Sequence, residues 1–294
     1  MRFFRKIVPY TSGLYRGLYY VYIRLASKVR LRKKKPGGMN VQIHAAENCN
    51  LGCKWCNAFS PLIEDRLADL NALKRDLSRF SELSGGRIGS LAVSGGEPLL
   101  NPQLLEIIKH ARKCFPGQKL NIITNGIRLI DAGEDFWTTC AECGCTISLT
   151  CYPIEIDLKK VRQLALSHNV KLVFQDDTDI RNKTMYFSPL DPSGSQNADE
   201  SYKLCFMSNT DFVLENGRLY TCPTIAHIEY FNDYFGRNLV VTDRDYIDIY
   251  KAENMDAILS FFSKPMPFCS YCNKKGRVPG LGWEVSGKEI SEWV

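Results

Sequence analysis

The sequence predicts an α/β protein whose parallel sheet is curled into a full or partial barrel. Strand-like apolar segments alternate with amphipathic helix-like segments between residues 41 and 175. Because parallel neighbouring strands need crossover connections, this order indicates right-handed βαβ units. The chain has 294 residues, 45% of them hydrophobic and 24% charged, which is ordinary for a globular protein. In such a fold, reactive groups gather at the carboxyl ends of the strands.

Each element of the barrel follows from its local pattern. Strands are expected at residues 41–46, 88–94, 120–125, 145–151 and 170–175. Helices are expected near residues 68–80, from Pro102, across 134–143 and over 158–167. The helix from Pro102 has Asn101 at its N-cap, and Leu104, Ile107, Ile108 and Ala111 give it one apolar face.

The pattern changes after about residue 186, where residues 188–201 are rich in Pro, Ser, Asp and Asn. Asn216-Gly217 lies between alternating segments and predicts a β-hairpin over residues 212–223, followed by a helix near 255–262. We therefore expect three parts. They are an N-terminal arm (1–39), a barrel (40–190) and a smaller C-terminal domain (191–294).

The N-terminal arm carries the basic character of the chain. Residues 1–40 hold eleven Lys or Arg and no Asp or Glu, against a net charge of +6 for the whole chain. At helical spacing it has an apolar stripe, formed by Leu14, Leu18, Val21, Leu25 and Val29. Such a helix could lie on an anionic membrane through residues 1–35, each basic residue adding about 1 kcal/mol, or it could dock on the body. No apolar run is long enough to span a bilayer.

The twelve cysteines indicate metal binding rather than disulfides, because the N-terminus lacks a cleavable signal. We therefore expect a reducing, cytoplasmic location, with the arm permitting contact with the inner face of the membrane.

Cys49, Cys53 and Cys56 form a CxxxCxxC pattern. Three thiolates do not complete a tetrahedral zinc site, whereas a cubane cluster with three cysteine ligands leaves one iron open. A zinc knuckle completed by a distant ligand is the alternative.

A second motif, SGGEP at residues 94–98, follows the second expected strand on the same edge of the sheet. Its glycines allow a ligand to approach the backbone, and Glu97 can pair with an ammonium group. Together, CNLGCKWC and SGGEP resemble the motifs of the radical SAM superfamily. The resemblance implies a partial (β/α)6 TIM-like barrel with a small C-terminal auxiliary-cluster domain.

By the same resemblance, Cys49, Cys53 and Cys56 would hold a [4Fe-4S] cluster that binds S-adenosylmethionine. Trp55 would lie by the adenine. The SGGEP residues would lie near the methionine moiety, and these are Ser94, Gly95, Gly96, Glu97 and Pro98. Asn125 and Ser148 match less specific positions on later strands, where the family often binds ribose or carboxylate.

Four further cysteines lie in the C-terminal region, namely Cys205, Cys222, Cys269 and Cys272. Their spacing suits zinc or an iron-sulfur cluster, since spacing does not distinguish soft metals. The arrangement resembles the twitch domain, a shortened form of the SPASM domain of radical SAM enzymes. This resemblance implies a second, auxiliary [4Fe-4S] cluster, fully ligated by protein, with an electron-relay or structural role.

The layout resembles the aminocyclitol and aminoglycoside dehydrogenases and epimerases, and the C-terminal tail resembles radical SAM proteins of polysaccharide biosynthesis. These resemblances imply an oxidoreductase or epimerase that acts on a small-molecule or glycan substrate, a sugar or cyclitol. They also imply an external electron donor of the flavodoxin or ferredoxin type. Cys151 ends a strand on the reactive edge and could donate hydrogen in an inversion, although strand alternation would turn it outward.

The remaining cysteines and histidines suggest no further site. Cys140, Cys143 and Cys145 lie at the opposite edge of the sheet and are expected to be core or surface thiols. We expect His44 to be a core histidine and His227 to belong to no cluster.

Three other functions remain open. Peptide modification is the first, although only 48 residues precede Cys49, too few for a winged-helix leader-binding domain. RNA modification through the basic arm is the second, but we do not expect a nucleic-acid partner. A non-enzymatic zinc-binding protein is the third.

Overall fold

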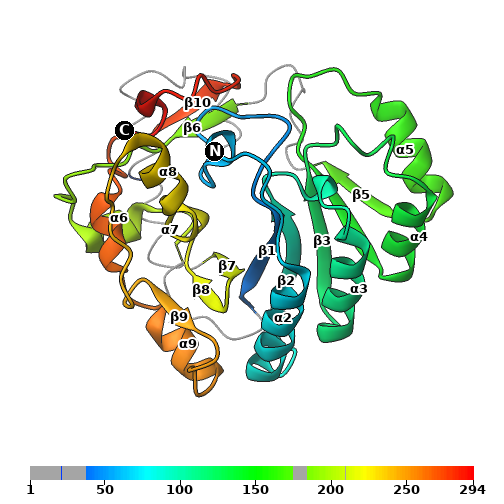
Figure 1. Ribbon diagram of the computed structural model, residues 1–294, viewed down its shortest axis with the longest axis horizontal. Coiled ribbons are helices and arrows are strands. Elements are labelled where there is room, and N and C mark those ends of the chain that lie inside the picture. The colour runs from blue at the N-terminus through cyan, green and yellow to red at the C-terminus, as the bar shows by residue number, and fades with distance from the viewer. Residues whose placement is uncertain (1–20, 22–37, 175–183, 209) are drawn as a thin grey trace.

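A curved sheet of eight strands runs through the described part of the protein (Figure 1). The computed structural model describes residues 21, 38–174, 184–208 and 210–294. The predicted apolar stripe of the arm lies outside these residues except at Val21, so membrane contact stays a prediction. Within the described residues, no helix combines the length and the apolar character needed to cross a membrane.

The first five strands are parallel and follow one another in space, as the sequence predicts. Their bounds are β1 (Asn40–Ala46), β2 (Ser90–Gly95), β3 (Lys119–Thr124), β4 (Cys145–Leu149) and β5 (Lys171–Phe174). The connecting helices are α2 (Leu70–Ser84), α3 (Leu104–Cys114), α4 (Glu134–Glu142) and α5 (Leu158–Ser167). Helices α2 to α5 lie along the outer side of the curved row (Figure 1). The predicted α/β partial barrel is therefore confirmed.

Helix α2 shows how local sequence sets these boundaries. The Asp69 carboxylate accepts a hydrogen bond from the Ala72 amide at 2.8 Å and caps the first turn. Leu73, Leu77 and Phe80 recur on one face of the helix and are buried against the sheet. The helix ends at Gly85, whose φ of 57° is the left-handed conformation that favours glycine.

The start of helix α3 differs from the prediction. The helix begins at Leu104 rather than Pro102, and Pro102 lies in a turn before it. The Asn101 side chain accepts from the Gln103 amide at 2.8 Å and donates to the Ala45 carbonyl at 2.7 Å. Asn101 thus joins the helix start to the end of β1, a role that requires a tertiary partner.

The predicted hairpin consists of β7 (Asp211–Glu215) and β8 (Arg218–Tyr220). Asn216 and Gly217 both have positive φ, 50° and 72°, as a type I′ turn requires. Strand β7 also pairs with β1 in parallel, and β9 (Tyr246–Asp248) extends the sheet beyond β8. The main sheet therefore continues past residue 190, and the three-part division of the chain stays a prediction.

Short elements complete the C-terminal region. Strands β6 (Thr184–Phe187) and β10 (Val278–Gly282) form a separate antiparallel pair. The helices are α6 (Ala198–Leu204), α7 (Pro223–Ala226), α8 (Ile228–Phe235) and α9 (Met255–Phe261). The apolar core is continuous from Ile43 on β1 to Phe231 on α8, so the two regions are packed together.

One buried carboxylate joins the hairpin to the barrel. Asp76 on α2 accepts hydrogen bonds from the Gly217 amide and from the Tyr250 hydroxyl, each at 2.7 Å. Hydrogen bonds to a charged group contribute more than neutral ones, and removing the carboxylate leaves a buried donor without a partner.

We predict that Asp76→Ala lowers the free energy of unfolding by about 2–4 kcal/mol, because both hydrogen bonds are lost. Anaerobic urea denaturation would measure the change. Asp69→Ala is the matched control, since it removes an exposed cap on the same helix and should cost about 1 kcal/mol. Equal losses in the two variants would contradict this role of Asp76.

Candidate functional site

A cavity of about 210 Å³ lies at the carboxyl ends of the parallel strands. The loop after β1 contributes the three thiols of Cys49, Cys53 and Cys56 to its wall. Of the predicted cofactor-binding residues, Trp55, Ser94, Gly95, Gly96 and Asn125 also line it. Residues far apart in the sequence thus meet at the edge of the sheet where the parallel-strand pattern predicts a site.

Polar side chains direct hydrogen bonds toward the thiols. The Trp283 indole N–H donates to Cys53 Sγ at 3.2 Å, and Asn125 Nδ2 lies 3.7 Å from Cys49 Sγ. Asn125 Nδ2 also donates to Asn50 Oδ1 at 2.8 Å, which fixes the amide at the cavity wall. Donors to sulfur are typical of iron-sulfur sites, where they tune the cluster.

Burial favours the neutral form of the thiols in this cavity. Burial, together with the nearby Glu97 and Cys56, raises the pKa of Cys49 to about 11. Burial also raises the pKa of Cys53 to about 12, although the Trp283 hydrogen bond opposes this. Bound metal would supply the positive charge that stabilises the thiolates, because a coordinating thiol is deprotonated.

The two glycines of SGGEP let two loops come into contact. A Cβ on Gly95 would lie 2.0 Å from the Ala46 carbonyl oxygen, and one on Gly96 would lie 2.2 Å from that of Asn48. The Gly96 amide donates to the Ala46 carbonyl at 2.7 Å, so the loop after β2 is fastened to the loop that carries the thiols. Only residues without a side chain fit there.

Glu97 forms hydrogen bonds inside the protein, and its predicted ion pair with an ammonium group stays a prediction. Its carboxylate is fully buried and is not part of the cavity wall. It accepts hydrogen bonds from Thr124 Oγ1 and the Asn125 amide, each at 2.8 Å, and from the Leu99 amide at 3.2 Å. Glu97 thereby links the ends of β2 and β3 inside the protein.

Three other predicted residues also lie off the wall. Pro98 is buried at the start of a short turn after Glu97, and Ser148 on β4 does not line the cavity. Thr150 and Tyr152 line it instead, with the intervening Cys151 absent from the wall. This placement agrees with the outward orientation expected from alternation and does not favour Cys151 as a hydrogen donor, a role that stays a prediction.

The four C-terminal cysteines come together around a second cavity of about 40 Å³. Cys205, Cys222, Cys269 and Cys272 all line it, with Lys274 beside them. Burial, together with the neighbouring Cys205 and Cys272, raises the pKa of Cys222 to about 12. Burial opposes ionisation of Cys205 too, but the charges of Lys274 and Arg277 outweigh it and lower its pKa. These cations suit the negative charge of a thiolate-bound cluster.

The spacing of the thiols does not identify the metal. Within the described ranges, neither cysteine set forms a group of three ligand atoms that all lie within 4.8 Å of one another. Iron-sulfur clusters and zinc both use such soft thiolate ligands, so elemental analysis has to distinguish them.

The thiols around β4 lie away from both cavities. Cys140, Cys143 and Cys145 are buried near the amino end of the strand, as expected for structural thiols. Cys140 and Cys145 share a hydrogen bond inside the core.

The expectation that His227 belongs to no cluster is wrong. His44 Nδ1 lies 2.9 Å from Glu47 Oε2, and His227 Nδ1 lies 3.4 Å from the same oxygen and 3.2 Å from Glu215 Oε2. Burial lowers the pKa of His227 to about 3 and raises that of Glu215 to about 8. No sequence signal could have revealed this cluster, because it depends on the pairing of β1 with β7.

Comparison with known proteins supports the cysteine site. Residues 43–152 match the family model described as the Radical SAM superfamily. The matched segment includes CxxxCxxC and SGGEP, the two motifs that line the larger cavity. Members of this family use a [4Fe-4S] cluster and S-adenosylmethionine, and the arrangement of Cys49, Cys53 and Cys56 fits such a cluster.

Curated relatives match only in part. Molybdenum cofactor biosynthesis protein 1 of Bos taurus is 28% identical over 89 residues, which are 30% of this chain and 14% of that protein. The S-adenosylmethionine-dependent nucleotide dehydratase of Flammeovirga pacifica is 32% identical over 92 residues, 31% of each chain. The match therefore spans less than a third of either relative.

Two solved structures are also similar to the chain. BtrN in complex with AdoMet and 2-DOIA is 16% identical with a TM-score of 0.48, covering 82% of this chain and 94% of that one. The anSMEcpe structure with bound AdoMet and Cp18Cys peptide is 18% identical with a TM-score of 0.36, covering 46% and 42%.

We predict that Gly96→Ala lowers the iron content after anaerobic reconstitution from about eight to about four per chain, because its Cβ would displace the loop of the first cluster. Iron and sulfide analysis would measure this. Gly117→Ala is the control, since no atom lies within 4 Å of a Cβ at that position. Full iron content in Gly96→Ala would show that the loop contact is not needed.

Proposed function

We propose, from the match of residues 43–152 to the Radical SAM superfamily, that the protein cleaves S-adenosylmethionine and oxidises a sugar or cyclitol. A [4Fe-4S] cluster with bound S-adenosylmethionine supplies, on reduction, a 5′-deoxyadenosyl radical able to attack an unactivated C–H bond. The residues of the chain would hold the reactants and exclude water, and a cluster held by the C-terminal cysteines would accept an electron. A reducing, cytoplasmic setting and a flavodoxin or ferredoxin donor belong to the same proposal.

The polar wall of the larger cavity supports a hydroxylated substrate. Hydroxyl and amide side chains face it from several loops, among them Ser60, Ser94, Thr150 and Asn125. The buried Ser60 hydroxyl has no hydrogen-bond partner among the described residues, which costs free energy unless a bound molecule supplies one. A ribose or sugar hydroxyl has the chemistry to do so.

The main support for the proposal is the wall that the two cavities share. Asn57 and Tyr186 line both of them, and Asn57 Nδ2 donates to the Tyr186 hydroxyl at 2.6 Å. A substrate radical in the larger cavity would therefore form next to the four C-terminal cysteines. A metal cluster held there could accept the second electron, while the substrate hydroxyl loses its proton and a ketone forms.

This proximity favours dehydrogenation over epimerisation. Inversion needs a hydrogen donor on the cavity wall, and Cys151 does not line it. Since the relatives bear the names of a nucleotide dehydratase and a GTP 3',8-cyclase, nucleotide-linked sugars belong among the candidate substrates. Peptide modification is the second candidate.

We predict that the reconstituted protein, with a reductant and S-adenosylmethionine, forms 5′-deoxyadenosine and converts a sugar or cyclitol to a product lighter by two hydrogens. Cys53→Ala should abolish both products, because the first cluster is lost. Cys222→Ala should retain 5′-deoxyadenosine but lose at least about 90% of the ketone, since one missing ligand impairs electron acceptance. Mass spectrometry of the anaerobic reaction would measure each product.

The outcome also separates the alternatives. A product that keeps the substrate's mass in ordinary water but gains one deuterium in heavy water would indicate inversion. Activity on peptides alone would indicate the second candidate. Unchanged ketone formation by Cys222→Ala would contradict an electron-accepting role for the C-terminal cysteines.

A further inference from the structure

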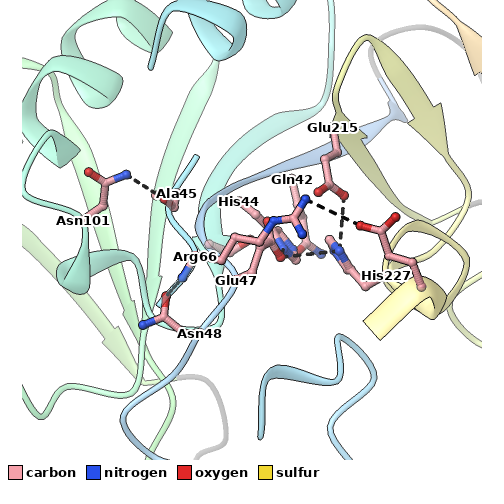
Figure 2. A network of polar contacts seen from close by, with 11 residues as sticks. Gln42, His44, Ala45, Glu47, Asn48, Arg66, Asn101, Glu215 and His227 are labelled. Atoms are coloured by element: carbon pink, nitrogen blue, oxygen red, sulfur yellow. Dashed lines mark hydrogen bonds and ion pairs between the residues drawn. The ribbon is translucent and has the colours of Figure 1, made fainter. Parts of the chain in front are cut away.

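Four side chains that the proposed reaction does not use meet on the other side of β1. His44 lies on β1, and Glu47 is the first residue after that strand. Glu215 is the last residue of β7, and His227 lies between α7 and α8. Figure 2 shows Glu215 and His227 turned toward each other with His44 and Glu47 beside them. We name these four residues the His-Glu cluster.

The spacing of three members of the His-Glu cluster matches the ligands of one metal ion, and Glu215 contacts one of these three. In the part of the chain that the structure describes, His44, Glu47 and His227 are the group whose ligand atoms all lie within 4.8 Å of one another. Separations of 2.9, 3.2 and 3.4 Å join the facing nitrogen and carboxylate atoms. The edge of a tetrahedron around zinc with nitrogen and oxygen ligands is about 3.4 Å.

The cluster also has unused ligand atoms in its interior. His227 is fully buried, and within the described residues neither of its ring nitrogens makes a hydrogen bond. Glu215 Oε2 lacks one as well, although it lies 3.2 Å from His227 Nδ1. Buried polar atoms without partners are costly, and a bound cation would use these lone pairs.

The charge of the site suits a divalent cation. Two carboxylates and two imidazoles lie close together, and Arg66 is the cation beside them. Its guanidinium lies 3.7 Å from Glu229 and 5.1 Å from the Tyr230 ring, at a side chain that is 54% exposed. The arginine is therefore partnered outside the cluster and leaves the interior to an ion.

An adjoining cavity provides access. It has a volume of about 180 Å³, and His44, Glu47 and Glu215 line it. The imidazole planes of His44 and His227 differ by 17° with centroids 4.4 Å apart, so one ring must turn about χ2 to direct its nitrogen at a common ion. Imidazole and carboxylate ligands suit zinc and other divalent transition metals.

We propose that His44, Glu47, Glu215 and His227 bind a divalent transition-metal ion, with Zn²⁺ as the representative, apart from both cysteine sites. The ion joins the end of β1 to the hairpin and to the start of α8. Because Glu47 precedes Cys49 by two residues, the ion also fixes the base of the loop that carries the first thiols.

The test is zinc binding by the cluster-loaded protein. After anaerobic reconstitution and dialysis against Zn²⁺, elemental analysis should find about one zinc per chain. X-ray absorption at the zinc edge should show only nitrogen and oxygen neighbours at about 2.0–2.2 Å and no sulfur at about 2.3 Å. This readout is specific for zinc and does not depend on enzymatic activity.

Variants decide whether the cluster is the site. His227→Gln and the nearly isosteric Glu215→Gln should each weaken zinc binding at least about tenfold while the iron content stays unchanged. His168→Gln is the matched control, because His168 forms a 2.9 Å pair with Glu134 elsewhere. If His227→Gln fails to fold, the zinc binding of Glu215→Gln alone tests the proposal. Absence of bound zinc, a sulfur shell, or wild-type affinity in Glu215→Gln would overturn the proposal.

Discussion

The contact between the loop after β1 and the loop after β2 is the constraint on which the rest of the structure depends. The amides of Gly96 and Glu97 donate to the carbonyls of Ala46 and Asn48 at 2.7 and 3.0 Å. This contact leaves no room for a Cβ on Gly95 or Gly96. It holds the thiol-bearing loop at the mouth of the cavity, and the buried Glu97 carboxylate ties the same point to β3.

Residues at and just after the end of β1 contribute to two groups of ligands, one toward β2 and one toward β7. Toward β2 and β3, the chain presents Cys49, Cys53 and Cys56 to the larger cavity. Toward β7, it presents His44 and Glu47 to Glu215 and His227. One strand end thus positions two groups of ligands with different chemistry, soft thiolates on one side and imidazole with carboxylate on the other. A displacement of this loop would disturb both groups together.

The sequence predicts what depends on neighbours along the chain. Periodicity locates the strands and helices of the barrel, and Asn216-Gly217 locates the hairpin turn. Motif spacing identifies the thiols, because a metal cluster imposes short intervals between its ligands. The parallel pairing of β7 with β1 places the segment that follows β7, with His227, beside His44. The interior orientation of Glu97 depends on the Thr124 hydroxyl and the Asn125 amide at the end of β3. Such contacts follow from tertiary register, which local patterns do not encode.

The most direct test of the central claim is electron paramagnetic resonance of the reduced, reconstituted protein with and without S-adenosylmethionine. If the loop after β1 holds a cluster with an open iron, adding the cofactor should change the spectrum of one cluster and leave the signal of the other unchanged. A spectrum that S-adenosylmethionine does not alter would mean that the cluster is fully ligated by protein and would contradict the account.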